Sequence, residues 1–346
     1  MAHGVYLVGS VPMASAREVF CAVCDAVGPH LRWLPDGETG ERLDWVAGME
    51  PVFAASPALQ PSGREFRLHP AATPRTRYTL RPGKTIADLS FSDLGYLRHA
   101  RESWAEFQAL KREGRIPSHV KFQVDLVPAH SVLWLFLEDE LHEAADPLYN
   151  AAVMAELDAI AALIPHDQLA IQFDVASAVF ARIQRGDVSN YGRTKDEMQA
   201  RFSQILIDFC DRVPKRVDLL LHFCYGDSNH KHVVEPTDMG DMVEFANRVA
   251  AGSARAIQMI HFPVPRDRSD DAYFAPLSGL KVGPAVELCL GLVHHTDGII
   301  GTRARLATAR RHVQNFMIAT ECGFGRRRPE TIPELLRIHA QAAEES

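Results

Sequence analysis

The chain has no long hydrophobic run. No segment approaches the roughly 18 consecutive apolar residues of a membrane-spanning helix, so no transmembrane segment is expected. The N-terminal residues show no basic start followed by a long apolar stretch, so no secretory signal is expected either. We therefore expect a cytoplasmic protein without a membrane partner.

Positive charge is also scarce. The 346 residues carry 37 Lys and Arg against 44 Asp and Glu, a formal net charge of −7. This balance argues against a nucleic-acid partner, because such binding needs clustered basic side chains. The tripeptide Arg326-Arg327-Arg328 is short and lies among Gly and Pro, which indicates a solvated loop or an anion contact at a site rim. A small-molecule substrate is expected, and the choice between monomer and homo-oligomer stays open.

Cysteine is sparse as well, with six residues in the whole chain. Without a secretory signal these thiols are expected to be reduced, and they can serve as core residues, metal ligands or nucleophiles. Cys21 and Cys24 have CxxC spacing. There is no second CxxC, however, and their apolar neighbours indicate one face of a helix rather than a metal or redox pair.

A GxGxxG loop is missing after the first predicted strand, which argues against a doubly wound, dinucleotide-binding sheet. Instead, roughly eight strand-then-helix units follow one another with short connections. The predicted strands are residues 5–8, 31–35, 120–126, 169–174, 217–223, 256–261, 281–293 and 315–320. The predicted helices are residues 16–26, 94–113, 145–164, 195–212, 238–251, 303–313 and 332–343. We predict a single (β/α)8 TIM barrel over residues 1–346, with a β-hairpin-like insertion near residues 60–82; an open sheet is the alternative.

The most informative stretch is residues 217–227. Its leucines at 219–221 indicate a buried strand, which ends in His222 and Cys224. Residues two apart on a strand point the same way, so this pair can present a nitrogen and a sulfur to one point. Zinc favours that donor pair. The alternative is a buried His and a buried Cys that happen to be two residues apart.

Polar or metal-binding side chains recur where other predicted strands end. They are Ser10, Glu38, Asp174, His222, Cys224, His261, His294, His295 and Cys322. In a barrel the carboxyl ends of the strands converge on one face, where catalytic groups come from several strands. Together these residues predict a functional site.

Five short motifs at these positions resemble the C-terminal catalytic barrel of the cobalamin-independent methionine synthase family, in the superfamily that includes uroporphyrinogen decarboxylase. The motifs are Val8-Gly9-Ser10-Val11-Pro12, Asp36-Gly37-Glu38, Gln172-Phe173-Asp174, His222-Phe223-Cys224-Tyr225 and Cys322-Gly323. The resemblance implies zinc bound by His222, Cys224 and Cys322. It also implies that Ser10, Glu38 and Asp174 bind an amino-acid substrate such as homocysteine.

Two departures from the family pattern matter. The family's remaining zinc ligand is a Glu at the end of the next strand, and here that strand ends in His261. With His261 as the fourth ligand the site would carry a formal charge of zero, which favours Lewis acidity over the nucleophilicity of a bound thiolate. After Asp174, the acidic and Pro residues of the family are replaced by Val175-Ala176-Ser177. No motif supports the folate-type methyl donor that the family uses.

We expect a zinc-dependent methyl or alkyl transferase acting on a small, homocysteine-like thiol. The alternative is a zinc-dependent lyase or hydrolase of an oxygenated small molecule on the same barrel. His294, His295 and Asp227 are the candidate catalytic residues, since a His near a barrel mouth can act as a general acid or base near neutral pH. A non-catalytic binding protein is the third possibility.

Overall fold

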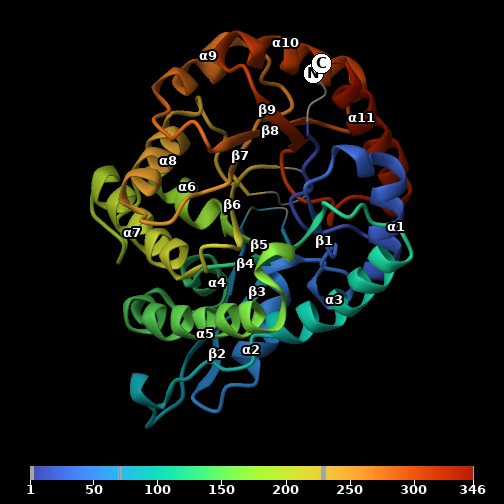
Figure 1. Cartoon of the computed structure of the whole chain (residues 1–346). Helices are drawn as coiled ribbons and strands as arrows, with labels where there is room; N and C mark the ends of the chain where they lie inside the picture. The colour runs from blue at the N-terminus through green and yellow to red at the C-terminus, as the bar shows by residue number, and fades with distance from the viewer. Residues whose placement is uncertain (1–3, 69, 71, 227–230, 346) are drawn as a thin grey trace.

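A curved parallel sheet forms the centre of the molecule (Figure 1). The computed structural model describes residues 4–68, 70, 72–226 and 231–345. The sheet has seven strands in the order β1-β4-β5-β6-β7-β8-β9. They are β1 (Trp33–Pro35), β4 (Lys121–Leu126), β5 (Leu169–Val175), β6 (Asp218–Phe223), β7 (Met259–Pro263), β8 (Glu287–Val293) and β9 (Phe316–Thr320). Nearly all their residues are buried, as expected for a parallel sheet that is covered by helices.

The outer strands β1 and β9 come together around Val5. This residue forms single parallel bridges to Leu31 and to Ile318. Its N–H donates to the carbonyl of His30 at 2.9 Å, and the next N–H, that of Tyr6, donates to the carbonyl of Ile318 at 2.9 Å. The strand predicted at residues 5–8 is therefore a one-residue bridge, cut short by the turn at Gly9-Ser10. The described chain shows a curled seven-stranded sheet, which is less than the complete eight-stranded barrel that we predicted.

Helices cover the outside of this sheet (Figure 1). The long ones are α1 (Ala16–Val27), α3 (Tyr96–Arg112), α5 (His142–Leu163), α7 (Lys195–Arg212), α8 (Gly240–Gly252), α10 (Gly298–His312) and α11 (Ile332–Glu344). All seven were predicted, with bounds that differ by at most three residues except at the start of α10, which begins five residues earlier than predicted. Hydrogen bonds from N-cap side chains determine where some of these helices begin. The Ser15 hydroxyl accepts from the N–H of Glu18 before α1, and Thr194 forms a capping box with Glu197 before α7.

Shorter helices lie in the connections: α2 (Glu50–Ala54), α4 (Ala129–Phe136), α6 (Ser177–Arg185) and α9 (Asp271–Phe274). We predicted none of these four helices, and α4 and α6 follow β4 and β5 almost directly. Seven of the eight residues in α4 are buried, so its sequence lacks the amphipathic pattern of one polar and one apolar face that indicates a helix.

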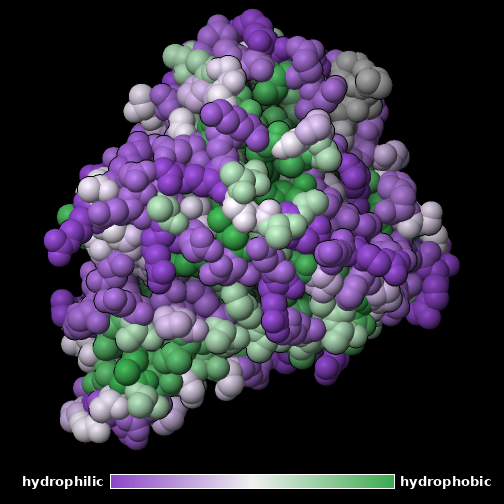
Figure 2. All heavy atoms as spheres, turned by 60° about the vertical axis from the view of Figure 1, so that its left-hand side comes forward, coloured by the Kyte–Doolittle hydropathy of each residue, from purple (hydrophilic) through white to green (hydrophobic). Residues whose placement is uncertain are grey.

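A hairpin extends from the lower end of the molecule in Figure 1. Strand β2 (Leu59–Phe66) pairs antiparallel with β3 (Arg75–Leu80), which confirms the predicted insertion. Arg77 ties the hairpin to the body by donating to Asp139 at 2.7 Å, and Tyr78 bridges to Leu137. The face shown in Figure 2 is mainly hydrophilic, with hydrophobic side chains gathered in recesses and at its lower end.

Candidate metal-binding site and its carboxylate neighbours

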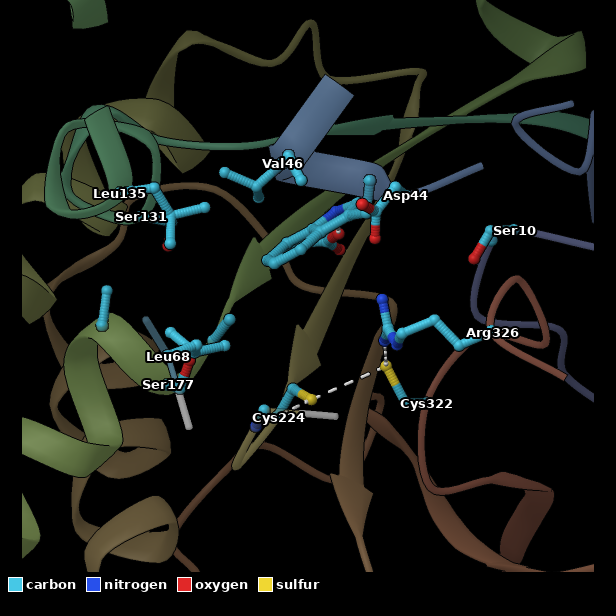
Figure 3. A pocket seen from close by; sticks show the side chains of 18 of the residues that line it. Ser10, Asp44, Val46, Leu68, Ser131, Leu135, Ser177, Cys224, Cys322 and Arg326 are labelled. Atoms are coloured by element: carbon cyan, nitrogen blue, oxygen red, sulfur yellow. Dashed lines mark hydrogen bonds between the residues drawn. The ribbon is translucent and has the colours of Figure 1, made fainter. Parts of the chain in front are cut away.

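Three of the four residues expected to bind a metal meet at the carboxyl ends of β6 and β9. His222 lies at the end of β6, Cys224 follows that strand, and Cys322 follows β9. One ligand atom of each residue lies within 4.8 Å of the other two. The two sulfurs are 3.7 Å apart, although 98 residues separate them in the chain (Figure 3). Among the described residues, this is a convergent set of one imidazole and two thiols.

His261 lies behind His222 and is not part of this set. The pairing of β5, β6 and β7 places Asp174, His222 and His261 side by side. The Nδ1 atoms of the two histidines are 2.8 Å apart, and Nε2 of His261 is 3.1 Å from the carbonyl oxygen of Thr320. Both nitrogens of His261 are therefore engaged within the protein. His261, expected as the fourth ligand, therefore supports the candidate ligand His222 instead.

These contacts define the protonation of both rings. The carbonyl of Thr320 can only accept, so Nε2 of His261 carries a hydrogen. Burial lowers the pKa of His261 to about 3 despite its contacts with the backbone of Thr320 and Phe223, so the ring is neutral and one of its nitrogens is an acceptor. Nδ1 of His222 must then donate to it. This leaves a lone pair on Nε2 of His222, which is the form that a metal ion binds.

The cysteine pair fits a zinc ion in geometry and in chemistry. Two Zn–S bonds of about 2.3 Å at a tetrahedral angle place two sulfurs roughly 3.7–3.8 Å apart. The observed 3.7 Å agrees with this value, and it is far longer than the bond of about 2.0 Å in a disulfide. Contact with Cys322 and burial raise the pKa of Cys224 well above its usual range. A bound cation would offset that penalty, because zinc binds cysteine as the thiolate.

Hydrogen-bond donors also face the sulfurs. The N–H of Gly226 donates to Cys224 Sγ at 3.2 Å, and the Arg326 guanidinium donates to Cys322 Sγ at 3.5 Å. Figure 3 shows Arg326 reaching toward Cys322 from the loop that follows β9. Both contacts favour the ionised form of sulfur.

The three candidate ligands open into a cavity of about 200 Å³. Its wall comes from the carboxyl ends of the strands, from α4 and α6, from Glu38 and residues 44–47, and from Leu68, Ala72, Thr73 and Arg75. Among the lining residues are all three substrate-binding residues predicted from the sequence: Ser10, Glu38 and Asp174. A Cβ on Gly323 or Gly325 would lie 2.6 or 2.7 Å from the Ser10 hydroxyl oxygen, so these glycines allow the loop after β9 to cross close to Ser10.

Asp174 is held in place by two donors. Gln172 Nε2 and Trp45 Nε1 each donate to its carboxylate at 2.7 Å. Burial nevertheless raises the pKa of Asp174 to about 8, with a further contribution from the nearby Cys322. The carboxyl group is therefore largely protonated at neutral pH until a cation enters the cavity.

Glu38 reaches the same cavity without a hydrogen-bond partner for its carboxyl group among the described residues. Burial and the charge of Asp174 raise the pKa of Glu38 to about 8. Its backbone has a φ of 44°, which is strained for a residue with a side chain. Asp36 stabilises this turn: it accepts from the N–H of Glu38 at 2.8 Å and pairs with Arg42 at 2.8 Å.

Asp125, at the end of β4, is a third buried carboxyl group that we did not predict. It is paired in register with Gln172 on β5, and its Oδ1 accepts from Gln123 Nε2 at 2.9 Å. Burial and the charges of Glu38 and Asp174 raise its pKa well above the usual range. The available signal was its position at a strand end, which it shares with the residues that we did select.

The predicted catalytic residues are not placed in this cavity. His294 and His295 line a neighbouring cavity behind Cys322. The ring of His294 turns toward the carbonyl of Val264, with Nε2 at 2.8 Å, and burial lowers its pKa to about 3. Asp227 lies outside the described residues.

In that neighbouring cavity His232 contacts the carboxylates of Glu321 and Glu235. These two partners raise the pKa of His232 to about 9 despite its burial, mainly through the hydrogen bond that His232 donates to Glu321. His232 is therefore cationic at neutral pH.

Solved structures of similar fold agree with the resemblance in the motifs. A B12-independent methionine synthase from Shewanella sp. W3-18-1, in complex with selenomethionine, aligns with a TM-score of 0.63 over 100% of this chain and 98% of its own. A putative vitamin-B12-independent methionine synthase from Listeria monocytogenes gives 0.57 over 100% and 98%, and a methyltransferase from Methanosarcina mazei gives 0.54 over 99% and 94%. Each is 12% identical to this chain, so the likeness is one of fold. No protein-family model and no curated protein matches the sequence.

The raised pKa of Glu38 predicts a pH-dependent effect of Glu38→Gln on stability. The folded pKa of about 8 lies above the usual value of roughly 4.3, so the stabilising contribution is present below pH ~4.5 and is lost as the pH rises toward 8. The difference in unfolding free energy between Glu38→Gln and wild type should therefore shift in favour of Glu38→Gln by at least about 1 kcal/mol as the pH rises from 5 to 8.5. Urea denaturation without added metal measures this difference.

Glu41→Gln is the matched control, because Glu41 lies on the same loop with an exposed side chain. Its difference from wild type should change little over the same pH range. If the Glu38→Gln difference is equally flat, Glu38 is ionised throughout and the buried-acid description is wrong.

Proposed function

We propose that this protein is a zinc-dependent transferase that moves a methyl or other alkyl group to a small thiol bearing an ammonium group. The observation that carries the proposal is the set of one imidazole and two thiols, with sulfurs 3.7 Å apart, in the same cavity as Glu38 and Asp174. A sulfur-binding centre thus faces groups that recognise a cation. The likeness in fold to methionine synthases and a methyltransferase agrees with this chemistry.

His222, Cys224 and Cys322 would hold the zinc ion, and the fourth coordination position would be left for the substrate. The bound ion would lower the pKa of the substrate thiol, so that thiolate exists at neutral pH. Two thiolates and a neutral imidazole balance the charge of the ion. His261 orients the imidazole of His222 through the hydrogen bond between their Nδ1 atoms.

Glu38 and Asp174 would bind the ammonium group of the substrate. An entering cation favours the ionised form of both carboxyl groups, so binding releases protons to solvent. Asp174 is already oriented by Gln172 and Trp45, whereas Glu38 has no competing hydrogen bond from the described residues. The pair therefore fixes the far end of the substrate while its sulfur lies at the cysteines.

The alternative, a zinc-dependent lyase or hydrolase, depends on His294 and His295 as acid or base. It has less support, because these histidines line the neighbouring cavity and the ring of His294 is bound to a backbone carbonyl. No feature of the described residues identifies a folate-type donor, so the proposal names the donor only as a source of a methyl or alkyl group.

The proposal includes a complete barrel, in which the segment around Val5 serves as the eighth strand. It also includes a small-molecule substrate and a cytoplasmic location. Within the described part of the chain, no helix combines the length and the apolar character needed to cross a membrane.

Metal binding is the first test. We expect the purified protein to take up about one Zn²⁺ per chain, and Co²⁺ in its place should give the absorption of cobalt–thiolate bonds. Cys224→Ser and Cys322→Ser should lose most of this absorption. His261→Phe should keep it while weakening metal affinity by about 10–100-fold, because it removes only the partner of a ligand.

Cys21→Ser is the matched control, since Cys21 is a half-buried thiol on α1, away from the cavity. It should bind metal like wild type. A wild-type protein that takes up no zinc would refute the proposal, and loss of the cobalt–thiolate absorption in Cys21→Ser would show that the wrong thiols were assigned.

A comparison of two ligands, with and without an amino group, tests whether the two carboxyl groups bind the ammonium group. Calorimetry should show that Glu38→Gln and Asp174→Asn each weaken homocysteine binding by about 10–100-fold, the usual effect of losing a hydrogen bond to a charged group. Binding of 4-mercaptobutyrate, which lacks the amino group, should change little. Equal losses for the two ligands would mean that the carboxyl groups do not recognise the ammonium group.

A further inference from the structure

A second cavity, of about 450 Å³, adjoins the one that contains the candidate metal ligands. Its wall comes from residues within the segments 36–57 and 90–100 and from part of β4. Glu38, Trp45 and Val46 line both cavities. The volume falls within the range of about 300–1,000 Å³ that is usual for small-molecule sites. The function proposed above assigns no ligand to this cavity.

Asp125 lines this second cavity with one carboxyl oxygen left unsatisfied. The residue is only 8% exposed. Its Oδ1 accepts from Gln123, whereas its Oδ2 has no hydrogen-bond partner among the described residues. A buried polar atom without a partner is costly, and a ligand that supplies a donor or a positive charge removes that cost.

Glu38 brings a second carboxyl group to the same place. A Cβ on Gly9 would lie 2.7 Å from Asp125 Oδ2 and 3.1 Å from Glu38 Oε2, so both oxygens lie close to the same side of this glycine. Gly9 permits their approach, because a side chain at this position would collide with them. Burial and neighbouring carboxylates raise the pKa of both groups, which shows that two negative charges here are unfavourable without a cation.

The two arginines among the described lining residues are engaged with other carboxylates. Arg42 pairs with Asp36 at 2.8 Å, and Arg98 lies 3.5 Å from Glu41. Neither arginine forms an ion pair with the two carboxyl groups that converge at Gly9. A ligand with a positive charge would therefore complete this part of the wall.

Aromatic side chains also line the second cavity. Trp45, Phe91 and Tyr96 are among its lining residues, and each is half-buried. The ring of Phe91 packs against the rings of Phe53 and Tyr149, with centroids 5.6 and 5.0 Å away. Aromatic rings attract cations through their faces, and they are the usual partners of quaternary ammonium groups, which have no N–H to donate.

We propose that this second cavity binds an organic cation, with the carboxyl groups of Asp125 and Glu38 supplying the opposite charge and the aromatic rings supplying apolar surface. Cation binding stands on the cavity itself. The assignment of the cation to the alkyl donor rests on the transferase function proposed above. The donor is then an onium compound, a quaternary ammonium or a sulfonium, held next to the thiol site at Glu38 and Trp45.

An onium donor satisfies the balance of atoms and electrons in the transfer. The ionised sulfur of the thiol substrate forms a bond to the alkyl carbon. The bond between that carbon and the positively charged nitrogen or sulfur breaks, and its electron pair stays with that atom. The product that leaves is neutral, so it loses its attraction to the carboxyl groups, which favours its release.

Calorimetry with the full chain tests the inference, with choline as the probe and 3,3-dimethyl-1-butanol as its uncharged analogue. We expect choline to bind at least tenfold more tightly than the alcohol, because the cavity recognises the charge. Asp125→Asn keeps the shape of the side chain and should weaken choline binding at least tenfold, while the alcohol is little affected. Phe91→Leu should weaken choline binding roughly three- to tenfold, as expected for the loss of one cation–π contact.

Asp174→Asn is the matched control, because Asp174 is a similarly buried carboxyl group that lines the first cavity and not the second. Choline binding should change little in this variant, whereas homocysteine binding should fall more than in Asp125→Asn. Equal affinity of wild type for choline and the alcohol would show that the inference is wrong. Unchanged choline binding in both Asp125→Asn and Phe91→Leu would show the same.

Ethanolamine, a primary ammonium compound, tests the class of the donor. Tighter binding of choline than of ethanolamine supports an onium donor, and the opposite preference would overturn that assignment. Zinc uptake is measured on the same proteins. A wild type that binds zinc but not choline contradicts the cation site alone, and one that binds choline but no zinc contradicts the transferase proposal alone.

Discussion

The 3.7 Å approach of the Cys224 and Cys322 sulfurs is the contact on which the rest of the site depends. It exists because the curled parallel sheet brings the carboxyl end of β9 round to that of β6, although two further strands lie between them. The single bridges of Val5 join the outer strands on the other side. A buried thiol and a half-buried thiol at this distance are a poor arrangement for ionised sulfur alone and a good one for sulfur that shares a cation.

The charged side chains around this contact are separated by sign. Glu38, Asp125 and Asp174 lie close together, and burial raises the pKa of all three carboxyl groups. The charges of neighbouring carboxylates raise the pKa values of Glu38 and Asp125 further, and Cys322 does so for Asp174. Arginines and the cationic His232 gather on the far side of Cys322. Acidic side chains therefore line the first cavity, and basic ones line the neighbouring cavity on the other side of Cys322.

Much of this arrangement follows from patterns in the sequence. Buried apolar runs predicted β4, β5, β6 and β9 because strands inside a parallel sheet are apolar on both faces. The side chains that end β5 and β6, and those just after β6 and β9, converge because all the strands run in one direction. His222, Cys224, Cys322, Glu38 and Asp174 could therefore be predicted to lie together.

Other features depend on packing that the sequence does not display. His261 was predicted to end its strand, but it lies in the middle of β7, where the register with His222 and the contact with the carbonyl of Thr320 make it a support for His222. His294 lies at a strand end too, yet its ring turns to Val264 and lines the other cavity. Asp125 was overlooked because a single acidic residue in an otherwise apolar strand is usually expected to face solvent. Helix α4 was missed because it is buried on nearly every side.

X-ray absorption at the zinc edge, on full-length protein loaded with zinc, tests the central claim most directly. The account predicts two sulfur neighbours at about 2.3 Å and at least one nitrogen neighbour at about 2.0–2.1 Å. A zinc environment of nitrogen and oxygen alone, or one with a single sulfur, would contradict it. The meeting of Cys224 and Cys322 would then be a packing contact without a role in metal binding.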